Sequence, residues 1–123
     1  ALQAFEGAPI PDPLRRAAYL LKLAGKKAAV LHDQTVSDPA MLMEAMEARE
    51  ELAEAESVDA VEQLQVEAGA KAIDLIAQLS RAFAAEDFDL ADRLATRFKY
   101  LRKYLEETRA RRISLEDAAE GKA

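Results

Sequence analysis

Residues 37–52 read SDPAMLMEAMEAREEL, and this stretch decides the fold. The carboxylate of Asp38 can cap a helix, and Pro39 fits the first helical turn because an amide proton there would have no partner. Nothing after Pro39 interrupts a helix before Glu56, so a helix is predicted over residues 38–56. Stepping about 100° per residue around this helix defines a first stripe. That stripe is predicted to face a core and consists of Met41, Ala45, Ala48, Leu52 and Ala55.

A second apolar group on the same helix turns toward the opposite flank. Its members are Leu42, Met43 and Met46. Beside it, at spacings of three and four, runs a row of carboxylates made of Glu47, Glu50 and Glu54. One interpretation is that a neighbouring segment, helix 13–24 or loop 26–36, covers this face as core, the commoner fate of a Met-rich stripe. The other is an exposed protein-binding patch with an acidic rim, which suits the flexible methionine thioether.

Similar start signals appear on both sides of this helix. Asp12-Pro13 predicts a short helix over residues 13–24, and Gly25 suits its end. Residues 26–36 show no clear period and are expected to form a loop. Ser57 can cap a third long helix. Its apolar residues recur at three and four, and they are Val61, Leu64, Ala68, Ala72, Leu75, Ile76, Leu79 and Phe83.

The last predicted helix begins near Glu86-Asp87, where acidic side chains suit a helix N-terminus. Its core stripe consists of Ala91, Leu94, Phe98, Leu101 and Leu105. Tyr100 and Tyr104 share a displaced face, with Arg97 beside them. Such tyrosines are either residues at the edge of a core or anchors of a protein interface. Residues 113–123 are polar and are expected to fray.

No segment alternates with a period of two, so no strands are predicted. The chain is expected to be all-α, an antiparallel three-helix bundle over residues 37–112 preceded by a short linking helix within residues 12–36. With 123 residues and half of them hydrophobic, one such domain can bury a modest core.

Composition excludes several classes of function. The net charge is −6, which argues against nucleic acid and anionic membranes as partners. The sequence has no cysteine, so it offers neither a disulfide nor a thiolate for zinc or an iron–sulfur cluster. No apolar run is long enough to span a bilayer. A cytoplasmic location is therefore expected.

An enzyme is not expected. A di-metal site in a helical bundle uses Glu-x-x-His motifs, whereas this sequence has one histidine, His32, in the predicted loop. The four glycines are scattered and form no phosphate-binding loop. We therefore predict no metal and no cofactor, and a di-metal enzyme remains only as a rival hypothesis.

Three segments resemble the HscB-type co-chaperones of iron–sulfur cluster assembly. Residues 12–21, DPLRRAAYLL, resemble the family's "DPLxRAxYLL" junction. Residues 37–52 are similar to its "DxxFLMEQMExREEL" helix, and residues 89–101, ending in KYL, resemble its last helix. Residues 1–11 are similar to the tail of a J domain followed by a linker. The J domain's His-Pro-Asp motif does not occur in this sequence, since no proline separates His32 from Asp33.

The resemblance implies a fold and a set of partners. In this family the C-terminal bundle binds the scaffold protein IscU, and the J domain stimulates HscA, a DnaK-class chaperone. The positions that match the family's scaffold contacts are Leu42, Met43, Met46, Glu47, Glu50, Glu54 and Tyr100. Members of the family are also described as oligomerising, so a homo-oligomer is possible and a self-association module without client delivery is the second rival hypothesis.

Overall fold

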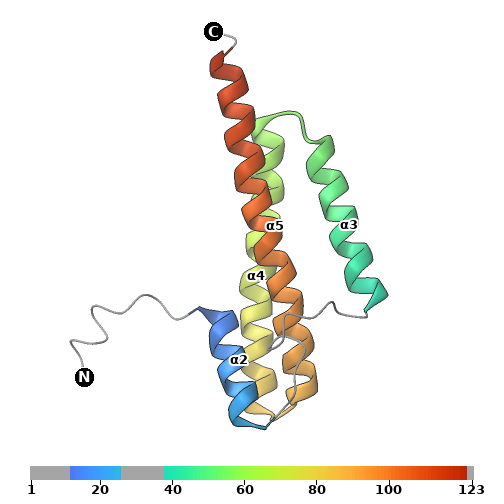
Figure 1. Ribbon diagram of the computed structural model, residues 1–123, viewed down its shortest axis with the longest axis vertical. Coiled ribbons are helices and arrows are strands. Elements are labelled where there is room, and N and C mark those ends of the chain that lie inside the picture. The colour runs from blue at the N-terminus through green and yellow to red at the C-terminus, as the bar shows by residue number, and fades with distance from the viewer. Residues whose placement is uncertain (1–11, 26–37, 122–123) are drawn as a thin grey trace, which may run out of the picture.

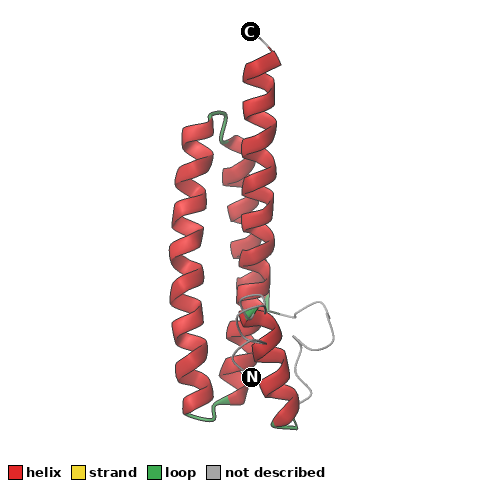
Figure 2. Ribbon diagram, turned by 90° about the vertical axis from the view of Figure 1, so that its left-hand side faces the viewer, coloured by secondary structure: helices red, strands yellow, loops and turns green. Residues whose placement is uncertain are grey.

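The computed structural model describes residues 12–25 and 38–121, and every element within them is an α-helix. The helices are α2 (Pro13–Leu23), α3 (Pro39–Glu54), α4 (Val58–Ala84) and α5 (Phe88–Gly121). In Figure 1 the three long helices run beside one another, and α2 lies against one end of α4 and α5. In Figure 2 short loops join α3 to α4 and α4 to α5. The predicted all-α class is confirmed.

Three of the four helices begin at the capping side chains that the sequence predicts, which are Asp12, Asp38 and Ser57, and α5 begins next to the predicted acidic pair. Asp38 accepts a hydrogen bond from the backbone amide three residues later at 3.2 Å, and Ser57 does the same at 3.1 Å. Asp12 accepts a hydrogen bond from the amide of Leu14, two residues later, at 2.9 Å, and Asp87 accepts one from the amide of Leu90, three residues later, at 3.2 Å. The predicted J-domain tail, residues 1–11, and the predicted loop, residues 26–36, lie outside the described residues.

The main core lies between α4 and α5, at the end where α2 joins them. Its buried residues are Ala17, Leu21, Leu75, Leu79, Ala82, Ala91, Leu94, Ala95 and Phe98. The predicted stripes are therefore largely buried, whereas Ile76, which recurs among the apolar residues of α4, is 40% exposed. Ile76 follows Leu75 directly, so its side chain projects about 100° further around the helix, away from α5.

A second, smaller core joins the other ends of α3, α4 and α5. Leu52, Ala55 and Val61 are buried there, and Tyr104 and Leu115 pack against them. Leu115 lies in the segment that was expected to fray, yet α5 continues to Gly121. Its packing gives this last part of α5 a physical reason to stay helical, together with hydrogen bonds from the neighbouring arginines.

Helix α2 is joined to α5 by an ion pair. Nη1 of Arg102 lies 2.6 Å from Oδ1 of Asp12, the residue that also caps α2. The hydrogen bond from Arg102 lowers the pKa of Asp12, although partial burial acts in the opposite direction. One carboxylate therefore both starts α2 and fixes it to the bundle.

Candidate functional site

Helix α3 rests on α5 and makes little contact with α4. Figure 1 shows it standing apart from the tightly paired α4 and α5. Met41 is buried at the start of the contact, and Ala45 and Ala48 are half-buried along it. Because these alanines are small, α3 is attached to the bundle by a narrow apolar strip.

Two ion pairs strengthen the attachment of α3. The guanidinium of Arg49 makes two bonds to the Glu107 carboxylate, at 2.9 and 3.2 Å, in a bidentate arrangement. Nearer the start of α3, Nη1 of Arg97 lies 3.3 Å from Oε2 of Glu44. All four side chains are partly exposed, so these pairs orient α3 more than they stabilise it.

The outer face of α3 carries six of the predicted site residues. Met43 is 62% exposed and Met46 is 64% exposed, while Leu42 is half-buried. The remaining three are the exposed carboxylates Glu47, Glu50 and Glu54. This exposure favours the surface interpretation over the core interpretation for the two methionines. We call these six residues the α3 patch.

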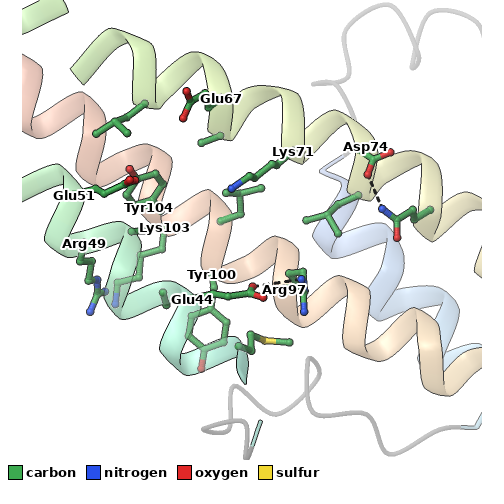
Figure 3. A pocket seen from close by; sticks show the side chains of 18 residues that line it. Glu44, Arg49, Glu51, Glu67, Lys71, Asp74, Arg97, Tyr100, Lys103 and Tyr104 are labelled. Atoms are coloured by element: carbon green, nitrogen blue, oxygen red, sulfur yellow. Dashed lines mark hydrogen bonds and ion pairs between the residues drawn. The ribbon is translucent and has the colours of Figure 1, made fainter. Parts of the chain in front are cut away.

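Tyr100, the seventh predicted site residue, lies elsewhere. It is half-buried and lines a groove of about 480 Å³ between α3, α4 and α5. Figure 3 shows it next to the pair formed by Glu44 and Arg97. No member of the α3 patch lines this groove. The structure thus brings six predicted residues onto one face and separates Tyr100 from them.

The groove was not predicted from the sequence. Its apolar lining comes from all three helices and includes Met41, Ala45, Leu64, Leu75 and Leu101. Tyr104 lies at the end opposite Arg97, near Glu51 (Figure 3). Burial raises the pKa of Tyr104, and the charges of Glu51 and Glu67 raise it further. The sequence feature that could have indicated this groove is the spacing of Tyr100 and Tyr104, which places both tyrosines on one face of the last helix.

Among residues 12–25 and 38–121, no group of three or more His, Cys, Asp or Glu side chains is placed to hold a metal ion. None of the helices within these two ranges is long and apolar enough to cross a membrane.

An all-helical bundle that displays an apolar patch beside a row of carboxylates is typical of a protein-binding domain. Residues 37–109 match the family described as the HSCB C-terminal oligomerisation domain. Because the match covers more than half of the chain, the chain belongs to this family.

Known proteins agree with this assignment. The chain is 46% identical over 59 residues to the co-chaperone protein HscB homolog of Paraburkholderia phytofirmans, over 46% of this chain and 33% of that protein. Its fold matches the Jac1 co-chaperone from Saccharomyces cerevisiae with a TM-score of 0.73 and 26% identity, over 80% of this chain and 64% of that one. A second Jac1 structure, from a 5–182 clone, gives a TM-score of 0.72. The chain spans about a third of the bacterial relative's length.

Proposed function

We propose that this chain is the scaffold-binding part of a co-chaperone of iron–sulfur cluster assembly. The α3 patch would bind an IscU-like scaffold protein, and a J domain would connect the bound scaffold to an HscA-like, DnaK-class chaperone. The observation that carries the proposal is the exposure of Met43 and Met46 on a helix that already buries a separate core stripe. The membership of the HscB family supports it.

The proposed mechanism is tethering. Linking a scaffold-binding module to a chaperone-binding module raises the local concentration of the scaffold at the chaperone. The sequence has no cysteine, so it supplies no thiolate to an iron–sulfur cluster. The cluster stays on the scaffold and is the cargo of the complex.

The two kinds of residue in the α3 patch would have different roles. Met43 and Met46 are flexible and exposed, so they adapt to a partner surface and supply the central apolar contact. The carboxylates Glu47, Glu50 and Glu54 remain at the rim, where charge mainly accelerates encounter. Tyr100 lies in the groove and not on the α3 patch, so we propose that it contacts the scaffold only at the edge of the interface.

The test is calorimetric titration with an IscU-like scaffold protein. The variant L42A/M43A/M46A should lose detectable binding, because a few central apolar residues carry most of the energy of an interface. Its melting temperature should stay close to that of the wild type, since two of the three side chains are largely exposed. A triple variant that unfolds would restore the core interpretation, and a folded one that binds normally would remove the α3 patch from the function.

A matched control comes from α4. The variant V66A/I73A/I76A also removes three apolar side chains that are exposed, but from a different helix. It should bind the scaffold as the wild type does. Replacing Glu47, Glu50 and Glu54 together by Ala should instead lower the association rate and weaken its dependence on salt, which stopped-flow mixing measures.

A further inference from the structure

The groove between α3, α4 and α5 is open because α3 leans on α5 and makes little contact with α4. Its volume of about 480 Å³ lies within the range of protein pockets that hold a ligand. Leu64 of α4 and Tyr104 of α5, which also pack against the small core, form the lining at one end. Both are only half-buried, so this end of the groove leaves apolar and aromatic surface open to a partner.

Two carboxylates from different helices meet at this end of the groove. Glu51 comes from α3 and Glu67 from α4, and both side chains are exposed. Burial raises the pKa of Tyr104 most, and the charges of both glutamates raise it further, so both carboxylates lie near its hydroxyl. Figure 3 shows Glu51 beside Tyr104 and Glu67 across the groove on α4. Within residues 12–25 and 38–121, neither glutamate makes an ion pair.

The spacing of Lys71 would allow it to pair with Glu67, because it lies one turn further along α4. In the described helices, however, these two side chains make no ion pair. This end of the groove therefore combines an aromatic ring, an apolar wall and two negative charges. A long cationic side chain complements all three. Its methylene stem packs on apolar surface, its head group bonds to carboxylates, and a cation is attracted to the face of an aromatic ring.

The α3 patch continues into this end of the groove. Glu51 lies four residues after Glu47 of the α3 patch, so the row of carboxylates extends along one side of α3 as far as the groove. Tyr100, which we propose to lie at the edge of the scaffold interface, is one turn before Tyr104 and lines the same groove. A scaffold bound to the α3 patch and to Tyr100 would therefore cover the opening beside Glu51.

We propose that the scaffold inserts an arginine or lysine side chain into this end of the groove, with its head group between Glu51 and Glu67 and its stem against Tyr104 and Leu64. This inference rests on the proposed function and adds a part of α4 to the scaffold interface. Met41 lies ten residues before Glu51 on α3, about 15 Å away along the helix, so the inserted side chain does not reach it.

Stopped-flow mixing with an IscU-like scaffold protein tests this site through Glu67, which lies outside the α3 patch. E67Q should raise the dissociation rate constant about tenfold, because the complex loses a hydrogen bond between charged groups. E62Q is the matched control. It removes the same charge from an exposed position of α4 that does not line the groove, and it should leave the dissociation rate constant unchanged. Equal dissociation rates for E67Q and the wild type, or equal effects of E67Q and E62Q, would overturn the proposal.

An exchange of two charges separates the position of the carboxylate from the net charge of the chain. E67K/K71E keeps the net charge but moves the carboxylate about 6 Å along α4, away from Tyr104. The complex of this variant with the scaffold should dissociate at least as fast as that of E67Q. Its melting temperature should stay close to that of the wild type, since both side chains are exposed. A complex that dissociates as slowly as that of the wild type would show that the position is unimportant, and the proposal would be wrong.

The variant L42A/M43A/M46A distinguishes a failure of this inference from a failure of the proposed function. If the wild type binds the scaffold, the triple variant does not, and E67Q dissociates like the wild type, then only the inference is wrong. If the wild type does not bind the scaffold, or if the triple variant binds it normally, the proposed function is wrong and the inference is wrong with it.

Discussion

Helix α5 faces α4 on one side and α3 on the other, and the two contacts are built differently. Toward α4 it buries Leu94 and Phe98 among the leucines of the main core. Toward α3 it meets alanines and makes two partly exposed ion pairs. The first contact holds the fold together, and the second holds a helix in position. The apolar side chains on the outer face of α3 therefore contribute little to the stability of the fold.

The largest effect is expected on the α4 side. Phe98 is 6% exposed in the main core, so Phe98→Ala should lower the free energy of unfolding by about 3–5 kcal/mol. Chemical denaturation followed by circular dichroism measures this change. Met43→Ala, on the outer face of α3, is the control and should change it by less than about 0.5 kcal/mol. If both variants lost the same free energy of unfolding, the outer face of α3 would contribute to the fold as much as the core between α4 and α5 does.

A smaller effect is expected on the α3 side. The bidentate pair between Arg49 and Glu107 is partly exposed, so its coupling energy should be about 0.2–1 kcal/mol. A double-mutant cycle with R49A and E107A gives this energy directly. The coupling should shrink in high salt. A coupling energy as large as the loss from Phe98→Ala would mean that ion pairs, and not the alanine strip, dominate the attachment of α3.

The smallest effect concerns α2 and depends on pH. Because Arg102 lowers the pKa of Asp12 in the folded chain, the pair stabilises the fold fully above the ordinary aspartate pKa of about 3.9. This stabilisation is lost as the pH falls through the lowered value. The unfolding free energies of wild type and D12N should therefore converge on acidification, with asparagine keeping the helix cap.

Arg102 provides the control for this measurement, because its guanidinium is the main cause of the lowered pKa of Asp12. In chains that carry R102A, D12N should change the unfolding free energy by an amount that depends less on pH than it does in the wild type. A gap between wild type and D12N that widens in acid would contradict the assigned role of Arg102.

Local signals in the sequence were sufficient for most of the fold. Asp38 with Pro39, and Ser57, predict helix starts because capping depends on neighbours only a few residues away. The two faces of α3 also follow from periodicity alone, and Met43 and Met46 are exposed as the surface interpretation expects. Whether they bind a scaffold is not a property of the fold and stays a prediction.

What the sequence could not predict depends on contacts between distant segments. The bond between Arg49 and Glu107 joins residues 58 positions apart, and no local pattern pairs them. The groove beside Tyr100 exists because α3 leans on α5 and away from α4. The end of α5 stays helical because Leu115 packs against the small core near Leu52. The local sequence of this segment is polar, and for that reason fraying was expected.

The three methionines of the chain all lie on α3, which makes one measurement especially direct. Met41 is 3% exposed in the core, while Met43 and Met46 are exposed, so ¹³C-methyl methionine NMR reports both faces of the helix at once. On titration with an IscU-like scaffold protein, the signals of Met43 and Met46 should shift or broaden strongly and that of Met41 should change least. A titration in which Met43 and Met46 stay unchanged while the scaffold binds would contradict the assignment of the α3 patch.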